Sequence, residues 1–424
     1  MTEHTDVVIA GGGPSGSTAA TLLAKAGLRV IVLESETFPR FHIGESLLPQ
    51  SYRIWERLGI VDQLEARYIR KYGARFVDCR TERSETYAFE DAFHPTSHYA
   101  FQVPRADFDD LLLRHAATCG AVVRHGWTVR EVMFDRDVAV GVRASDADGT
   151  VHEIFARVVL DATGRDTLLA SRVRTKWRIP GLDKTAVFGH FVGVERQTGR
   201  AEGTIDIVVF PHGWFWNIPF RGEVNSVGVV CSSTWMRARR SGETLDAFFT
   251  RTLDDAGWMK RTMAGAQRIN PARALADFSY RVDRLAGDGW AMIGDAAGFL
   301  DPLFSTGAHL AFRGAEMAAD HIVAELGAGR PLVAASWSAY ETELRSGADL
   351  FLGAVQAFYD GTLSELVFQQ PQRRVLRQTI TSMLAGDVFD STATWARFLR
   401  ERFAARLPEG DAPVAPAGAT PMIE

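Results

Sequence analysis

A glycine-rich turn near the N-terminus constrains the fold of this chain more than any other feature. Residues 6–16 read DVVIAGGGPSG, so a short apolar run leads directly into a G-x-G-x-x-G spacing. Residues 17–27 then show helical spacing, and a second apolar run, RVIVLE, follows at 29–34. This order of strand, turn, helix and strand predicts a dinucleotide-binding βαβ unit.

Each residue of this unit has a physical reason to be there. Gly11 permits the tight turn, Gly13 lets a pyrophosphate approach the backbone, and Gly16 lets the helix pack closely on the strand. The helix N-terminus offers free N–H groups and the positive end of its dipole to the phosphates. Glu34, at the end of the second strand, can accept hydrogen bonds from the adenosine ribose.

Two later segments indicate which dinucleotide is bound. An apolar run ends in VVLDATGRDT at 158–167, and a second one reads GWAMIGDAAGF at 289–299. With the glycine turn, they resemble the class A flavoprotein monooxygenase superfamily, which implies FAD. The resemblance also implies that Asp295 of the GD pair contacts the flavin-side ribose, that Gly298 belongs to the same cofactor-binding turn, and that Arg105 lies near the cofactor.

The stretch GWFWNIP at 213–219 indicates which flavoenzyme this is. Strand alternation puts both indoles on one face of a sheet. Trp214, Trp216, Ile218 and Pro219 resemble the WxWxIP signature of the flavin-dependent halogenases. That resemblance implies that the indoles form a barrier beside the passage of a small oxidant, so that the substrate cannot reach the flavin. Packing in a sheet core is the other interpretation and is compatible with it.

Further segments resemble the same halogenases. FHIGESLLP at 41–49 is similar to their conserved stretch after the second strand, and RKYGARF at 70–76 supplies Lys71 where phenol and pyrrole halogenases carry their active lysine. Burial lowers the pKa of an ammonium group, and a neutral amine is the nucleophile toward an electrophilic oxidant. Lys71 is therefore the expected catalytic residue.

The segment DPLFSTG at 301–307 resembles the one that holds the halide in this family. The resemblance implies that Ser305, Thr306 and Gly307 bind chloride or bromide at a helix N-terminus, where an anion needs no basic side chain. An ordinary helix cap is the simpler interpretation. Phe304 stands where tryptophan halogenases carry a glutamate, which favours the phenol and pyrrole group.

The resemblance implies an oxidoreductase that uses FADH2, O2 and a halide to halogenate an electron-rich phenol or pyrrole in natural-product (antibiotic) biosynthesis. The chain shows no clear second nucleotide-binding pattern for NADH, so a separate flavin reductase is the expected partner. Three alternatives remain open: a flavin-dependent aromatic hydroxylase, a geranylgeranyl-reductase-like flavoprotein, and a non-catalytic flavin-binding scaffold.

The substrate is either free or attached to an acyl or peptidyl carrier protein. The C-terminal helical pattern gathers arginines between 373 and 406. Because carrier proteins are usually acidic, such a surface can steer one to the enzyme. A solvated helix face with local ion pairs is the competing interpretation.

Composition excludes several other classes. The net charge of −5 argues against a general nucleic-acid binder. The three cysteines show no metal-ligand spacing, so we expect neither a metal site nor a disulfide framework. No signal peptide and no apolar run of about 18 residues is evident, which predicts a cytoplasmic protein with no membrane partner.

The patterns together predict a mixed α/β fold. It combines a Rossmann-like FAD-binding domain, an interleaved antiparallel-sheet substrate domain and a C-terminal helical region. The expected boundaries are 1–73, 104–184 and 271–330 for the FAD-binding domain, 74–103 and 185–270 for the substrate domain, 331–406 for the helical region, and 407–424 for a flexible tail.

Overall fold

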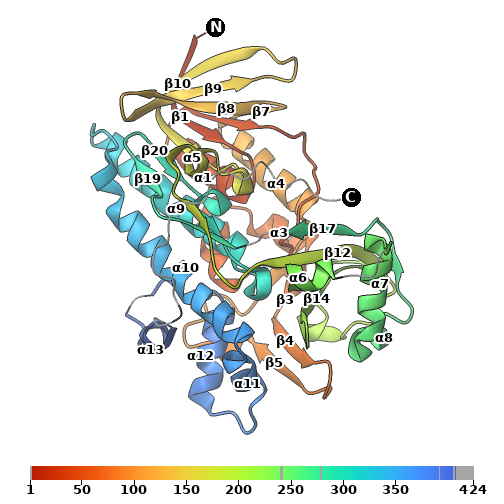
Figure 1. Cartoon of the computed structure of the whole chain (residues 1–424). Coiled ribbons are helices and arrows are strands. Elements are labelled where there is room, and N and C mark those ends of the chain that lie inside the picture. Colours follow the sequence, from red (N-terminus) through yellow and green to blue (C-terminus); the bar gives the residue numbers. More distant parts are fainter. Residues whose placement is uncertain (1, 239–241, 277–278, 391, 404–405, 407–424) are drawn as a thin grey trace.

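The computed structural model describes residues 2–238, 242–276, 279–390, 392–403 and 406, and the expected tail at 407–424 lies outside them. It has the predicted mixed α/β architecture, with two large sheets and a group of helices at the C-terminal end (Figure 1). The predicted domain boundaries remain a prediction.

The first sheet carries the predicted nucleotide-binding unit. Its main path runs β19-β20-β10-β1-β2-β7, and the pairs from β20 to β7 are parallel. The strands are β1 (Thr2–Ala10), β2 (Val30–Glu34), β7 (Val122–His125), β8 (Thr128–Asp135), β9 (Val138–Ser145), β10 (Val151–Asp161), β19 (Ala286–Gly287) and β20 (Trp290–Met292). The carboxyl ends of β1, β2 and β10 meet at one edge, where ligands bind in such sheets.

Helices cover the strands of this sheet. The helix after the glycine turn, α1 (Pro14–Lys25), contacts α9 (Thr306–Gly327) and α4 (Arg105–Thr118). Its residues 14–23 are all buried, which its small side chains allow. Three shorter helices complete this part: α2 (Tyr52–Leu58), α3 (Val61–Arg67) and α5 (Leu168–Val173).

The second sheet holds the tryptophan pair. Its path runs β16-β12-β15-β14-β13-β4-β5, with β17 also paired to β12. The strands are β4 (Gly73–Asp78), β5 (Ser84–Ala88), β12 (Lys184–Val192), β13 (Ile205–Phe210), β14 (Gly213–Pro219), β15 (Val224–Ser232), β16 (Gln267–Arg268) and β17 (Arg273–Ala276). The sheet is antiparallel except where β13 joins β4 in parallel, because these strands come from separate parts of the chain.

Two small sheets connect the large ones. β3 (Ile69–Lys71) pairs with β6 (Ala100–Gln102), so β6, which falls in the 74–103 segment expected in the substrate domain, lies outside the second large sheet. β11 (Lys176–Arg178), β18 (Tyr280–Val282) and β21 (Gly298–Phe299) form the other small sheet. Lys71 is therefore the last residue of a short strand that runs between the two halves of the molecule.

The two faces of the second sheet have different covers. Phe215 packs in a cluster with residues of α7 (Leu245–Asp255) and α8 (Gly257–Thr262), next to α6 (Ser233–Arg237). Trp214 and Trp216 lie in a second cluster, with residues of α10 (Ser338–Tyr359), α11 (Thr362–Phe368), α12 (Arg374–Leu384) and α13 (Thr394–Phe403). The prediction that both indoles share one face is confirmed, because Phe215 between them points the other way.

Within the described residues, none of the helices has the length and apolar character needed to cross a bilayer. In the same part of the chain, His, Cys, Asp and Glu side chains nowhere gather in a group of three that could hold a metal ion.

Candidate active site

The glycine turn between β1 and α1 has the geometry that a dinucleotide needs. A side chain at Gly11 would lie 2.3 Å from the Ala162 carbonyl oxygen, and one at Gly16 would lie 2.0 Å from the Gly11 carbonyl oxygen. Gly11 also has φ +105, which favours glycine. At Gly13 the nearest atom, Nη2 of Arg40, is 3.6 Å away. Two glycines are thus required by packing, while the third leaves open space before the helix N-terminus.

Glu34 is held against this turn. Its carboxylate accepts hydrogen bonds from the Gly12 N–H at 2.7 Å and the Glu36 N–H at 2.9 Å. The residue is 5% exposed. These bonds fix the carboxylate at the carboxyl end of β2, where the ribose of a dinucleotide lies in folds of this type.

Arg105 and Asp295 form a second polar group. Nε of Arg105 lies 2.7 Å from Oδ1 of Asp109, and Nη1 donates to the Ile43 carbonyl oxygen at 2.6 Å. Burial alone would lower the Arg105 pKa, but the carboxylates of Asp109, Asp295 and Glu45 together outweigh burial and the pKa is raised. Burial raises the pKa of Asp295, against the opposing effect of Arg105 and Arg165. The charges of Arg105 and Asp295 therefore act on each other, and their contact with a cofactor stays a prediction.

The predicted halide turn adjoins Asp295. A side chain at Gly307 would come within 4.0 Å of the Asp295 carboxylate and 3.9 Å of the Phe299 ring. Ser305 has a φ of +58 and precedes α9. Thr306 is fully buried, and its Oγ1 has no hydrogen-bond partner among the described residues. A buried hydroxyl without a partner at a helix N-terminus is suited to an anion.

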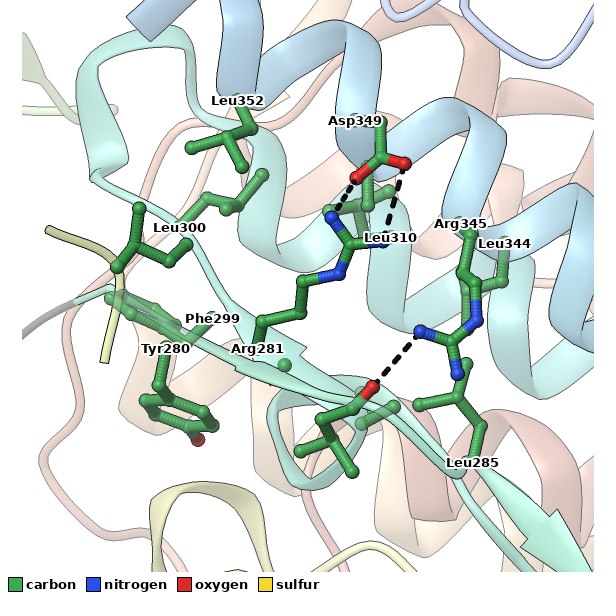
Figure 2. Close-up of a pocket in the computed structure, with 16 residues that line it drawn as sticks. Tyr280, Arg281, Leu285, Phe299, Leu300, Leu310, Leu344, Arg345, Asp349 and Leu352 are labelled. Carbon is green, nitrogen blue, oxygen red and sulfur yellow. Dashed lines mark hydrogen bonds and ion pairs between the residues drawn. The ribbon is translucent and has the colours of Figure 1, made fainter. Parts of the chain in front are cut away.

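Gly298 borders a pocket beside the cofactor turn. Figure 2 shows this pocket, which Gly294, Gly298 and apolar side chains of α9 and α10 line. Arg281 points toward Asp349 in an ion pair of 2.9 Å, and Arg345 donates to the Val282 carbonyl oxygen at 3.1 Å. Lys71 and the tryptophans are not among its lining residues. The pocket therefore adjoins the turn at Gly294 and Gly298 and is separate from Lys71.

Lys71 is enclosed, and no carboxylate pairs with it among the residues that the structure describes. Its side chain is 1% exposed, and Nζ donates to the Leu47 carbonyl oxygen at 3.1 Å. Nζ also lies 5.3 Å from the centre of the Phe89 ring. Burial lowers the pKa of the Lys71 ammonium to about 7. At neutral pH, both the amine and the ammonium form are therefore populated.

The tryptophans of β14 are fixed by hydrogen bonds. Nε1 of Trp214 donates to the Tyr359 hydroxyl at 3.1 Å, and Nε1 of Trp216 donates to Ser226 Oγ at 3.0 Å. Their ring centres are 6.0 Å apart. Gly228 faces Trp216, because a side chain there would lie 2.3 Å from the indole.

Ile218 and Pro219 complete the predicted WxWxIP signature and are buried at the end of β14. Lys71 contacts Phe89, which belongs to the same hydrophobic cluster as both tryptophans.

One segment, residues 43–47, contacts both Arg105 and Lys71. Arg105 donates to the carbonyl oxygen of Ile43, while Lys71 donates to that of Leu47. Between them, the buried Glu45 carboxylate lies 2.9 Å from Nε2 of His190 on β12. Sequence analysis found the segment but assigned no role to Glu45 or His190, since nothing local indicates that they meet.

Tyr359 and Arg40 also lie at this site, and no sequence motif indicates them. Tyr359 lies on α10 and meets Trp214 across the fold, and Arg40 lies near Gly13. His309 bonds Ser51 and the Gly386 carbonyl through its two ring nitrogens, at 2.9 Å each, which fits a structural histidine.

Comparisons with known proteins agree on one family. The tryptophan halogenase family model matches residues 6–98 and 90–365. A 1H-pyrrole-2-carbonyl-(peptidyl-carrier protein) chlorinase of Pseudomonas fluorescens is 30% identical over 413 residues, covering 92% of this chain and 91% of that protein. The corresponding brominase of Pseudoalteromonas luteoviolacea is 30% identical, covering 91% of this chain and 92% of that protein.

Solved structures give the same result. The flavin-dependent brominase Bmp2 has a TM-score of 0.83 at 29% identity, covering 95% of this chain and 99% of that chain. The myxobacterial chondrochloren halogenase CndH, described as a new variant of FAD-dependent halogenases, has a TM-score of 0.80 at 30% identity, covering 97% of this chain and 99% of that chain.

Proposed function

The chain belongs to the tryptophan halogenase family, and on this premise we propose that it halogenates a pyrrole tethered to a carrier protein, with Lys71 as the catalytic residue. It is a flavin-dependent halogenase, an oxidoreductase acting on aromatic or pyrrole substrates, as its relatives are. These relatives favour halogenation over the hydroxylase, the reductase-like flavoprotein and the flavin-binding scaffold that the sequence left open.

The residues around the glycine turn fit FAD. The open space at Gly13 suits the pyrophosphate, and the fixed Glu34 carboxylate suits the ribose. Arg105 and Asp295 hold the flavin end. When bound, reduced FAD would give two electrons to O2 and the halide would give the other two, so that the halide becomes an electrophilic hypohalous acid and the second oxygen atom leaves as water. We propose that a separate reductase delivers the reduced flavin, since the chain carries one glycine-rich dinucleotide turn.

The halide is assigned to the turn at Ser305, Thr306 and Gly307. The partnerless Thr306 hydroxyl supports this assignment, together with the free N–H groups at the start of the long helix α9. No preference between chloride and bromide follows from these contacts, and the two pyrrole-acting relatives are a chlorinase and a brominase.

Lys71 is the observation that carries the proposal. The group is fully enclosed, and its pKa of about 7 is caused by burial alone. The neutral amine can form an N–halogen bond as the O–halogen bond of the hypohalous acid breaks, with the amine proton and the hydroxide leaving as water, while the protonated form can donate a hydrogen bond to the oxidant. The Leu47 carbonyl aims the nitrogen in either state. Trp214 and Trp216 fill the adjoining cluster with rigid rings, which limits passage to small molecules.

The C-terminal helices support a carrier protein as the form of the substrate. Arg373 and Arg374 at the start of α12 and Arg397 and Arg402 on α13 are exposed. By contrast, Arg377, Arg400 and Arg406 bind carboxylates or backbone carbonyls of the chain itself. Two exposed apolar side chains accompany these exposed arginines: Val375 is 65% exposed and Phe398 is 56% exposed. This combination suits an acidic, partly apolar partner surface.

The test compares a carrier-bound pyrrole with the free pyrrole acid and with free phenols, using FAD, a flavin reductase, NADH and chloride or bromide. Mass spectrometry detects the halogen isotope pattern. We expect turnover of the carrier-bound pyrrole to fall at high salt, because exposed charges are screened beyond about 8 Å at physiological ionic strength. Efficient halogenation of a free phenol, unaffected by a carrier, would replace the tethered substrate with a free one.

A further inference from the structure

A chain of hydrogen bonds joins the tryptophan barrier to the predicted halide turn. The Trp214 N–H donates to the Tyr359 hydroxyl at 3.1 Å, and that hydroxyl donates to Oδ2 of Asp301 at 2.8 Å. Oδ1 of Asp301 accepts from the Leu303 N–H at 3.1 Å. The three side chains come from β14, from the end of α10 and from the segment before α9, so only the tertiary fold brings them together.

Chemistry fixes which group donates and which accepts in each of these hydrogen bonds. An indole N–H can only donate, whereas a tyrosine hydroxyl can accept one hydrogen bond and donate another. Tyr359 must therefore accept from Trp214 and donate to Asp301. Trp214 is 1% exposed and Asp301 is fully buried, so water cannot easily replace the hydroxyl. Both neighbours depend on one oxygen atom.

Asp301 connects Tyr359 to the halide turn. Its carboxylate caps the turn at Pro302–Phe304, which leads directly into Ser305 and the first residue of α9. Ser305 is held in the left-handed region, at φ +58, which a non-glycine residue adopts only when its surroundings enforce it. A shift of Asp301 would therefore move the N–H groups and the hydroxyl assigned to the halide.

The ring of Tyr359 has a separate anchor. The Lys184 ammonium lies 3.9 Å from the ring centre. A phenylalanine at position 359 would keep the ring and this cation–π contact while removing only the hydroxyl. Tyr359→Phe therefore breaks this series of hydrogen bonds by deleting one oxygen atom.

We propose that Tyr359 is a positioning residue, which holds the Trp214 indole and the Asp301-capped halide turn in one fixed relation. This inference rests on the proposed function, since it assumes that the barrier and the turn serve halogenation. It predicts that loss of the Tyr359 hydroxyl separates flavin oxidation from halogen transfer.

The test is Tyr359→Phe, with Tyr87→Phe as the matched control. Tyr87 is fully buried where Tyr359 is half-buried, and its hydroxyl also donates, but to the Val367 carbonyl oxygen, which takes no part in the hydrogen bonds of Tyr359. Halogenated product and hydrogen peroxide are measured per reduced flavin consumed, together with the halide KM and kcat. We expect Tyr359→Phe to lower the product share about five-fold and raise the halide KM, because two buried groups lose their partner. The control should keep the wild-type share.

A double-mutant cycle separates positioning from simple stability. In a Trp214→Phe background, Tyr359→Phe should lower the product share less than it does in the wild-type protein, because the indole donor is already gone and only the Asp301 contact is left to lose. The same cycle on the melting temperature of the cofactor-free protein provides a readout without turnover, and we expect coupling there too. Additive effects in both readouts, or an unchanged product share in Tyr359→Phe, would overturn the inference. Absence of halogenation in the wild-type protein would instead overturn the proposed function.

Discussion

Lys71 and Arg105 are both buried cations, and both donate to carbonyl oxygens of the segment 43–47, yet their pKa values move in opposite directions. Arg105 contacts the Asp109 carboxylate through two nitrogens, at 2.7 and 2.9 Å, and its pKa is raised. Lys71 forms no ion pair within the described residues, and its pKa falls to about 7. Since both cations are buried, the carboxylates beside Arg105 account for the opposite directions of the two pKa shifts.

Removing the Lys71 amine should have the largest effect. Lys71→Ala should lower the halogenation rate by about 10²–10⁴-fold, as expected when a group that assists the chemical step is lost. Lys71→Arg should not restore activity, because arginine stays protonated. Product formation is measured by mass spectrometry and FAD affinity by titration, and affinity should not change. Lys260→Ala, which removes an exposed lysine on α8, is the control. Substantial activity in Lys71→Ala would remove the lysine from the mechanism.

Arg105→Met removes the buried cation that has a carboxylate partner. Among the described residues it leaves the buried Asp109 with Arg40, at 3.3 Å, as its ion-pair partner, and it removes one of two hydrogen-bond partners of the Ile43 carbonyl oxygen, the other being Nδ1 of His42. We expect the free energy of unfolding to fall by about 3–5 kcal/mol, measured by urea denaturation. Arg114→Met is a matched control, because Arg114 pairs with Asp110 on the same helix but is exposed. There the change should stay within about 1 kcal/mol. Equal losses in both variants would contradict the assigned role of burial.

The same substitution at Lys71 should have the opposite sign. The folded-state pKa of Lys71 is about 7 against a usual 10.5, so the folded protein binds fewer protons than the unfolded chain between these values. The destabilisation by Lys71 is therefore complete below pH 7 and disappears as pH rises toward 10.5. Lys71→Met should raise the free energy of unfolding by about 2–4 kcal/mol at pH 6. The gain should shrink at pH 9, and a gain independent of pH would show that packing causes it.

A counter-charge placed beside Lys71 should make it resemble Arg105. Ala100 pairs directly with Lys71 between β3 and β6, so its side chain lies on the same face. Ala100→Asp should move the midpoint of the pH–rate profile from about 7 upward by about 1–2 units, since a nearby carboxylate favours the ammonium. Ala100→Asn has a similar shape without the charge and should leave the midpoint in place. A common shift in both variants would mean that altered solvation, and not charge, sets the Lys71 pKa.

The sequence by itself determined the features that depend on short stretches of chain. The glycine turn, the strand that ends in Glu34 and the shared face of Trp214 and Trp216 all follow from local geometry. The motifs also identified the FAD-dependent halogenase family, because its signatures are contiguous. Lys71 could be named as a candidate from its motif, although the motif says nothing of its partners.

Only the tertiary structure decided which groups meet. The missing counter-charge at Lys71, the Asp109 carboxylate at Arg105 and the Tyr359 hydroxyl between Trp214 and Asp301 depend on side chains that the fold brings together. The parallel pairing of β13 with β4 and the pairing of β3 with β6 likewise join distant segments. Burial and electrostatic partnership are properties of packing, so a local pattern can propose a lysine, but its surroundings determine its pKa.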